Sequence, residues 1–262
     1  MKEIYFSSTL MWDASIEEMF QWVIESGFVG VELWAQHFDA REWQLETYKE
    51  KAEIYNIKTI LHSNSWDLNF ASLNKGIRTA SLNEIKSSID LAADLGAKEV
   101  TIHPPKETVS EARDVSMELA RQGIEALLDY SRRRNVELSL EIMEKLPKEL
   151  VTDLKSVKEM TGSLYDSFSY TLDIAHCNSI EEFKRSLKEI NHISKIHLSN
   201  KQGEKLHTKL SEGDFDFYEV FSILENENVT IVIEGLEKGR SFNTLKENIS
   251  LIQKIKEKLT WG

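Results

Sequence analysis

The chain has 262 residues, 41% of them hydrophobic, and a formal net charge of −12. The length and the hydrophobic fraction allow a large buried core. The negative net charge makes nucleic acid an unexpected partner, because general nucleic-acid binders neutralise phosphates with an excess of Lys and Arg. The sequence contains no long apolar run and begins with a segment that we interpret as a strand, so we predict neither a membrane span nor a signal peptide. The single cysteine, Cys177, allows no internal disulfide, and we expect a cytoplasmic protein.

A short apolar run rich in β-branched residues, a loop and an amphipathic helix recur along the whole chain. In chain order, the predicted strands are Ile4–Ser8, Gly30–Trp34, Thr59–His62, Glu99–His103, Glu137–Glu141, Tyr170–Asp173, Lys195–Leu198 and Thr230–Glu234. This alternation is typical of parallel strands that are joined by crossover helices.

The predicted helices show apolar stripes and capping residues. In Leu82–Leu95 the apolar side chains recur with helical period, and Gly96 is the expected stop. Ser15 followed by Glu18, and Ser179 followed by Glu182, have the spacing of a capping box at a helix N-terminus. A last helix, Thr244–Leu259, is expected to complete the outer layer.

Eight strand–helix units predict a single (β/α)8 barrel domain over residues 1–262, since such barrels need roughly 250 residues. An open doubly wound sheet is the alternative. That fold usually carries a glycine-rich phosphate-binding turn after its first strand, and here the turn reads Ser7-Ser8-Thr9-Leu10, without glycine.

Six consecutive predicted strands end in a residue that can bind metal or move protons. These residues are His62, His103, Glu141, Asp173, His197 and Glu234. A barrel brings all C-terminal strand ends to one mouth, where converging carboxylates repel one another unless a cation lies between them. We therefore expect one divalent metal, bound by Glu141, Asp173, His197 and Glu234. A mostly oxygen donor set suits Mn²⁺, Mg²⁺ or Co²⁺ and tolerates Zn²⁺.

Further side chains near the predicted mouth have two readings each. His62, His103, His176 and His207 either hold a second metal or hydrogen-bond a polyol substrate. Trp12, Trp34 and Trp66 follow the first three strands and either wall a sugar pocket or pack the loops. Lys205 either belongs to a solvated charged surface or recognises a phosphate or carboxylate on the substrate, for which it is the best candidate. His37 could reach the pocket, but we expect it to be solvated.

Several stretches resemble the xylose isomerase-like barrel superfamily, whose members include sugar isomerases and epimerases and zinc-dependent apurinic-site endonucleases. The resemblance covers essentially the whole chain and rests on the order and spacing of its motifs. These are Asp67-Leu68-Asn69, the run from Leu95 to Pro104, Leu140-Glu141, Leu172-Asp173-Ile174-Ala175-His176, Ile196-His197-Leu198-Ser199-Asn200, and His207 with Gly213-Asp214-Phe215-Asp216.

The two branches of this superfamily imply different uses of the same residues. The epimerase branch implies one metal on Glu141, Asp173, His197 and Glu234, with both glutamates as acid–base groups. The endonuclease branch implies a further zinc on His62, His103 and Glu141 and a third on His176 and His207. That third site needs an aspartate where this chain has Lys205, and Asn200 replaces another usual aspartate. Both departures weaken the endonuclease interpretation.

The leading hypothesis is a divalent-metal-dependent isomerase or epimerase of a keto sugar, sugar phosphate or inositol. A metal-stabilised enediolate would form as Glu141 or Glu234 removes a proton and the other glutamate returns one. Pure ligation by both glutamates, with a metal hydroxide as nucleophile, is the other interpretation and fits the runner-up, a zinc-dependent phosphodiesterase acting on abasic DNA. A barrel that binds without turnover is a third class. The sequence leaves the oligomeric state open, a homo-oligomer included.

Overall fold

The computed structural model describes residues 2–259, and its main sheet is parallel with a strand order that closes on itself. That order is β1 (Ile4–Ser7), β10 (Thr230–Ile233), β7 (Ile193–Leu198), β6 (Ser169–Asp173), β5 (Glu137–Ile142), β4 (Glu99–Ile102), β3 (Lys58–His62) and β2 (Gly30–Trp34). The predicted (β/α)8 barrel is therefore confirmed. Among the strands, the largest boundary difference is at β7, which begins at Ile193 instead of Lys195, whereas the helix predicted to begin at Leu82 begins at Lys75.

The chain divides into two compact units, each built from segments that are distant in the sequence. Unit 1 contains the residues up to 59, residues 173–185 and those from 194 onward, whereas unit 2 contains residues 60–172 and 186–193. The single domain predicted over residues 1–262 stays a prediction. No helix among residues 2–259 has both the length and the apolarity needed to cross a membrane.

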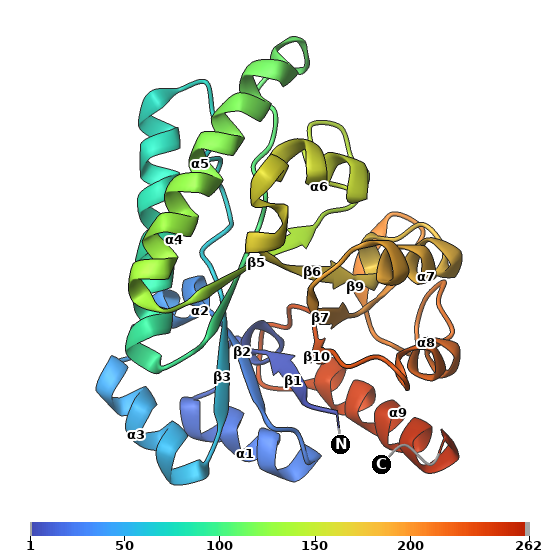
Figure 1. Cartoon of the computed structure of the whole chain (residues 1–262). Helices are drawn as coiled ribbons and strands as arrows, with labels where there is room; N and C mark the ends of the chain where they lie inside the picture. The colour runs from blue at the N-terminus through green and yellow to red at the C-terminus, as the bar shows by residue number, and fades with distance from the viewer. Residues whose placement is uncertain (1, 260–262) are drawn as a thin grey trace. The chain divides into compact units, whose positions relative to one another are not determined.

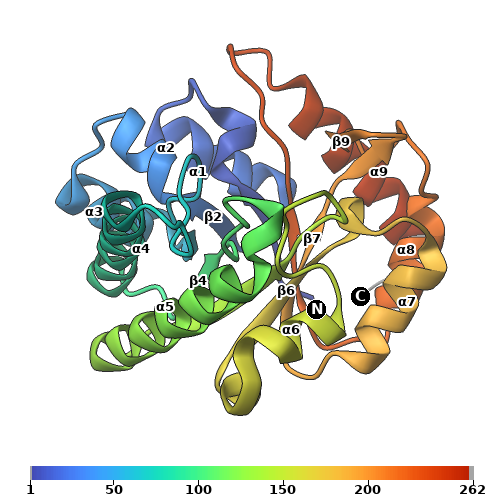
Figure 2. The ribbon, with the colours of Figure 1, turned by 90° about the horizontal axis from the view of Figure 1, so that it is seen from above.

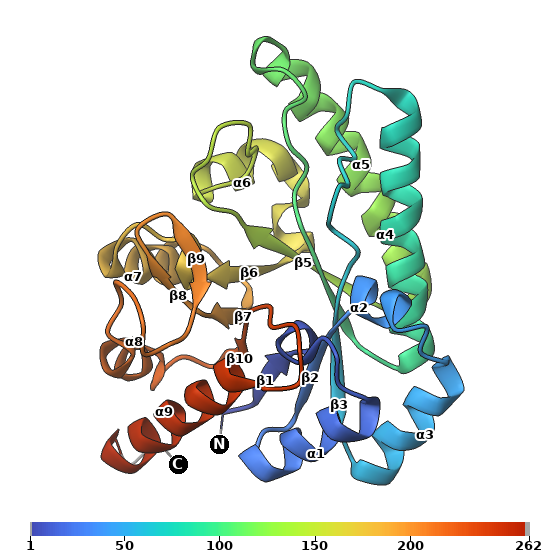
Figure 3. The same cartoon turned by 180° about the vertical axis from the view of Figure 1, so that it is seen from behind.

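Unit 1 holds four neighbouring strands in the order β2-β1-β10-β7, all parallel. Its helical elements are η1 (Ser8–Met11), α1 (Ile16–Ser26), α2 (Ala35–Ala40), α3 (Leu45–Tyr55), η4 (Ile174–His176), the first part of α7 (Ile180–Glu189), α8 (Phe217–Leu224) and α9 (Asn243–Leu259). Helix α1 contacts α3, and α8 contacts α9 (Figure 3). The predicted capping box begins α1, because Ser15 Oγ accepts from the Glu18 amide and the Ser15 amide donates to the Glu18 carboxylate.

An antiparallel hairpin follows β7 in unit 1, and the sequence analysis did not predict it. Its strands are β8 (Asn200–Gln202) and β9 (Lys205–Thr208), with Asn200 opposite Thr208. The hairpin lies against η4. It therefore brings His207 toward the residues that follow β6.

Unit 2 holds the other four strands in the order β3-β4-β5-β6, with the first two residues of β3 belonging to unit 1. Its helical elements are α4 (Lys75–Leu95), η2 (Ser110–Ala112), α5 (Arg113–Arg134), α6 (Leu154–Thr161) and η3 (Gly162–Ser167). The long helices α4 and α5 run side by side (Figures 1 and 2). The predicted apolar stripe of α4 is buried at Ile85, Ile89 and Ala92, and Gly96 ends the helix in a left-handed conformation, with φ at 73°.

Candidate active site and metal centre

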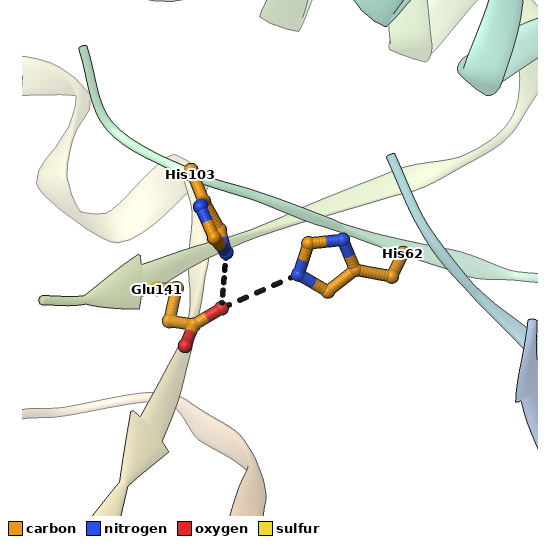
Figure 4. Close-up of side chains that lie close together, drawn as sticks. All are labelled: His62, His103 and Glu141. Atoms are coloured by element: carbon orange, nitrogen blue, oxygen red, sulfur yellow. Dashed lines mark hydrogen bonds and ion pairs between the residues drawn. The ribbon is translucent and has the colours of Figure 1, made fainter. Parts of the chain in front are cut away.

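Two imidazoles and one carboxylate meet in unit 2, at the C-terminal ends of β3, β4 and β5 (Figure 4). His103 Nε2 lies 3.1 Å and His62 Nε2 3.4 Å from the same oxygen of Glu141, Oε2. We call His62, His103 and Glu141 the unit 2 cluster. Its Glu141 and His62 side chains are almost completely buried, whereas 26% of the His103 side chain is exposed. The cluster can therefore be approached from the side of His103.

The alternation of side chains along β5 places Glu141 on the face of the sheet where this cluster lies. Ser139 and Glu141 are two residues apart on β5 and project to the same face of the sheet. The Ser139 hydroxyl lies 2.7 Å from the Thr171 hydroxyl of β6, which fixes that face. His62 Nδ1 lies 2.9 Å from the Ser63 carbonyl oxygen, an atom that only accepts hydrogen bonds, so Nδ1 carries a proton. His62 Nε2 then faces a carboxylate oxygen, and a proton or a metal ion belongs between the two.

Unit 1 gathers a larger group, to which β6, η4, β7, β9 and the residue after β10 each contribute one side chain. These residues are Asp173, His176, His197, His207 and Glu234, which we call the unit 1 cluster. All five are buried except His207, whose side chain is 35% exposed. Both carboxylates lie next to imidazole nitrogens, so the cluster offers oxygen and nitrogen donors together.

In the unit 1 cluster, one oxygen of Asp173 and one oxygen of Glu234 each lie within 4 Å of two imidazole nitrogens. His197 Nδ1 lies 3.3 Å from Glu234 Oε2. His207 Nδ1 lies 3.8 Å from Asp173 Oδ2 and 3.7 Å from Glu234 Oε2, and Ser199 Oγ holds that nitrogen at 2.9 Å. His176 Nε2 is 3.6 Å from Asp173 Oδ2. The Ala175 amide donates to Asp173 Oδ1 at 2.7 Å and so orients the carboxylate.

The sequence analysis missed Glu32, a fully buried residue of β2 in unit 1. Its carboxylate oxygens lie 3.0 Å and 3.3 Å from His197 Nε2, on the imidazole nitrogen that faces away from Glu234. The signal was present in the sequence, because Glu32 is the one charged residue of the apolar run Gly-Val-Glu-Leu-Trp. A charge within a buried strand needs a partner.

The predicted substrate-contacting residues fall into different environments. Trp34 ends β2 and is buried, Trp12 is half-buried, and Trp66 is 45% exposed in the loop after β3. Lys205 is exposed at the start of β9, two residues before His207. Their roles as substrate contacts stay predictions.

The expectation that His37 is solvated was wrong, because its side chain is fully buried. The ring stacks on Trp12 with centroids 4.7 Å apart and contacts Trp43 at 4.8 Å. Its Nε2–H donates to the Trp12 carbonyl oxygen at 2.9 Å. Burial lowers the pKa of His37 to about 4, although the hydrogen bond to Trp12 opposes that change. His37 is therefore a neutral, structural histidine.

Comparison with known proteins identifies the family. A profile described as xylose isomerase-like TIM barrel matches residues 20–257. The chain belongs to this family. Among curated relatives of this xylose isomerase-like chain are two proteins of Methanocaldococcus jannaschii, both named as uncharacterized. MJ1188 is 28% identical, with 83% of this chain and 82% of the relative covered, and MJ1311 is 26% identical, with 80% and 76% covered.

Solved structures with the same fold carry names of sugar epimerases. A D-tagatose 3-epimerase-like protein superposes with a TM-score of 0.82 at 20% identity, covering 99% of this xylose isomerase-like barrel and 100% of the other chain. The 3-keto-D-glucoside 4-epimerase YcjR from E. coli gives a TM-score of 0.79 at 15% identity, covering 98% and 100%. An L-ribulose 3-epimerase gives 0.77 at 15% identity, covering 98% and 95%. At these identities the likeness establishes the fold.

Proposed function

We propose that this protein is a divalent-metal-dependent isomerase or epimerase of a small sugar, namely a keto sugar, a sugar phosphate or an inositol. The observation that carries the proposal is the unit 1 cluster, in which two buried carboxylates meet imidazole nitrogens. The names of the three structural neighbours given above, each a sugar epimerase or an epimerase-like protein, support the same class of reaction.

The proposed metal ligands are Asp173, His197 and Glu234 of unit 1 together with Glu141 of unit 2. Glu141 is included because its strand, β5, pairs with β6, the strand that ends in Asp173. In that pairing Ile142, the residue after Glu141, lies opposite Leu172, the residue before Asp173. The donors fit a divalent cation, because Asp173 and Glu234 are buried, approach the same nitrogen of His207 and would repel each other without a positive charge nearby. Three carboxylates and one imidazole suit Mn²⁺, Co²⁺ or Mg²⁺ and also accept Zn²⁺.

The proposed chemistry is proton transfer next to a carbonyl group. A bound cation would supply Lewis-acid stabilisation of the negative charge that develops on the substrate oxygens. Glu141 or Glu234 removes the proton from the carbon next to the carbonyl, and the other glutamate returns a proton to the opposite face. Two bases on opposite sides of the substrate are what inversion requires, whereas an isomerase can work with one. The imidazoles of His176, His207 and His103 supply hydrogen-bonding groups for the hydroxyls of a sugar.

The test is incorporation of solvent deuterium into a panel of ketoses by the metal-loaded protein. Wild-type protein should exchange the proton next to the carbonyl. Glu141→Gln and Glu234→Gln should slow the exchange by about 100-fold to 10,000-fold, the usual contribution of a general base. Glu107→Gln is a matched control, because Glu107 is also buried but pairs with Arg113 in the loop after β4. Exchange at the wild-type rate in both site variants would refute the acid–base assignment.

A second candidate function is a zinc-dependent phosphodiesterase of the abasic-site type, and the unit 2 cluster is the observation that favours it. Two imidazoles on one carboxylate oxygen are the donor pattern of a further zinc site. Asn200 counts against this function. Its amide donates to the carbonyls of Leu210 and Phe215 and accepts from the amides of Lys201 and Phe215, so its side chain is occupied in holding the loop after the hairpin. Cleavage of an abasic oligonucleotide tests this candidate directly.

A further inference from the structure

Glu32, to which the proposed reaction gives no role, forms a fully buried pair in unit 1 with the proposed metal ligand His197. Glu32 lies on β2 and His197 on β7, and β1 and β10 separate these strands in the order β2-β1-β10-β7. The Glu32 side chain therefore reaches past two strands to meet the imidazole. Both side chains are fully inaccessible to solvent. A carboxylate in such a place requires a hydrogen-bond donor or a positive charge beside it.

The two nitrogens of His197 face different carboxylates. Nε2 lies 3.0 Å from Glu32 Oε2 and 3.3 Å from Glu32 Oε1, and its hydrogen bond is to Oε1. Nδ1 lies 3.3 Å from Glu234 Oε2, on the side of the unit 1 cluster. A neutral imidazole carries one proton, and Glu32 holds it on Nε2. The lone pair of Nδ1 then faces Glu234.

We infer that Glu32 is a positioning residue that fixes the tautomer and orientation of His197, so that Nδ1 is the nitrogen that binds the metal. This inference rests on the metal site proposed above. A carboxylate that accepts the far N–H of a metal-bound histidine fixes the ring and makes it a better ligand. Glu32 itself stays outside the set of ligands, because both of its oxygens lie on the Nε2 side of the ring.

Glu32 also makes the donor set rigid before the metal arrives. The Nε2 atom of His197 is hydrogen-bonded to the Glu32 carboxylate. In the same way, Oδ1 of Asp173 accepts from the Ala175 amide, and Nδ1 of His207 is hydrogen-bonded to the Ser199 hydroxyl. Loss of the Glu32 carboxylate would let the proton move to Nδ1, where it competes with a cation for the same lone pair. The expected consequence is weaker metal binding with the fold retained.

Two measurements on the same set of variants test this inference without any sugar. The variants are Glu32→Gln, Glu32→Leu and Glu32→Asp, with Glu107→Gln as the matched control. The first measurement is the ¹⁵N NMR spectrum of the imidazoles in metal-free protein, with the His197 signals assigned by their loss in His197→Gln. We expect the Nε2–H tautomer in wild type and loss of that preference in Glu32→Leu.

The second measurement is titration calorimetry with Mn²⁺ or Co²⁺. Glu32→Gln and Glu32→Leu should raise the Kd by about 10-fold to 100-fold, as is usual for a lost hydrogen-bond partner of a metal ligand. Glu32→Asp keeps a carboxylate and should recover part of the affinity, and Glu107→Gln should bind as wild type does. The Gln variant has nearly the same shape as Glu, which keeps the test valid if Glu32→Leu does not fold.

The possible outcomes separate this inference from the proposed function. A wild-type tautomer and wild-type Kd in both Glu32→Gln and Glu32→Leu would overturn the role of Glu32 and leave the metal site standing. Wild-type protein that binds neither metal would refute the metal site itself. In that case the tautomer spectra alone decide whether Glu32 sets the protonated nitrogen of His197.

Discussion

The unit 1 and unit 2 clusters combine imidazoles and carboxylates in different arrangements. In unit 2, two imidazoles approach a single carboxylate oxygen of Glu141, and the nitrogen–oxygen distances are 3.1 Å and 3.4 Å. In unit 1, the carboxylates of Asp173 and Glu234 stand among three imidazoles, and a further carboxylate, Glu32, supports one of these from behind. In unit 2 two imidazoles share one carboxylate, whereas unit 1 has two carboxylates among its imidazoles and an outer supporting residue.

This difference gives the two clusters different roles in the proposed function. A cluster with oriented carboxylates and a supported imidazole is prepared for a hard or borderline divalent cation. A pair of imidazoles on one carboxylate, open on the side of His103, is prepared either for a second, softer cation or for the hydroxyl groups of a substrate.

Asp173→Asn should have the largest effect, because it removes a charge from the centre of the unit 1 cluster. We expect metal affinity and sugar turnover to fall at least about 100-fold, since even outer partners of a metal ligand contribute 10-fold to 100-fold. Calorimetric metal titration and a deuterium-exchange assay measure the two losses. Asp166→Asn is the control, because the Asp166 side chain is 78% exposed and pairs only loosely with His192, at 3.5 Å. Equal losses in both variants would deny Asp173 a special role.

His37 is a buried histidine outside both clusters, and its pKa shows how burial alone acts on an imidazole. Burial lowers its pKa from 6.5 to about 4. Between these two pH values the imidazole is therefore mostly protonated in the unfolded chain and mostly neutral in the folded protein. This contribution to stability is complete above pH 6.5 and is lost as the pH falls toward 4, and it amounts to about 3 kcal/mol.

Urea unfolding of wild type and His37→Gln across that pH range measures the contribution of His37. The difference between their free energies of unfolding should shrink as the pH falls from 6.5 to 4. A difference that does not change with pH would show that His37 is protonated in the folded protein. The acidic groups titrate in both proteins and cancel in the comparison.

His103→Ala should have a smaller effect, which distinguishes the two possible uses of the unit 2 cluster. If the imidazole binds a substrate hydroxyl, the loss of one hydrogen bond of about 1 kcal/mol should raise the KM for the sugar up to about 10-fold. The metal content per chain should stay the same. Loss of one metal equivalent in His103→Ala would instead assign the unit 2 cluster to a second metal, and His62→Ala should then give the same loss.

Ser15→Ala should have the smallest effect, and it separates stability from metal binding. The variant breaks the capping box at the start of α1, far along the chain from every cluster residue of unit 1. We expect a loss of about 1 kcal/mol in the free energy of unfolding. The Kd for metal should not change. Weaker metal binding in Ser15→Ala would mean that affinity follows the stability of unit 1 and not the donor atoms.

Much of the fold follows from local patterns in the sequence. The strands are apolar and β-branched, the helices have buried stripes, and Ser15, Glu18 and Gly96 mark helix ends by chemistry that acts within a few residues. The hairpin of β8 and β9 escaped prediction because its strands are short and polar, with Asn-Lys-Gln in one and Lys-Leu-His-Thr in the other. Its position depends on side-chain contacts of Asn200 with Leu210 and Phe215, which lie 10 and 15 residues further on.

The candidate site was predictable where a polar residue ends a strand, and less so elsewhere. His62, Asp173 and His197 lie at or near strand ends, and the structure brings each into a cluster. Glu32 was missed because it lies inside a strand and not at its end, although a charge within an apolar run indicates a buried partner such as His197 on β7. His37 was misjudged because Trp12 and Trp43 enclose it from other segments of the chain. Such long-range packing has no local signature.

Elemental analysis of protein purified without added metal or chelator is the decisive test of our claim that the unit 1 cluster holds a divalent metal. We expect one equivalent of Mn, Co, Zn or Mg per chain in wild type and in His103→Ala, and its loss in Asp173→Asn. A wild-type protein without metal, or full retention of metal in Asp173→Asn, would contradict the claim. Two or three zinc ions per chain would contradict the single-metal sugar enzyme and favour the phosphodiesterase.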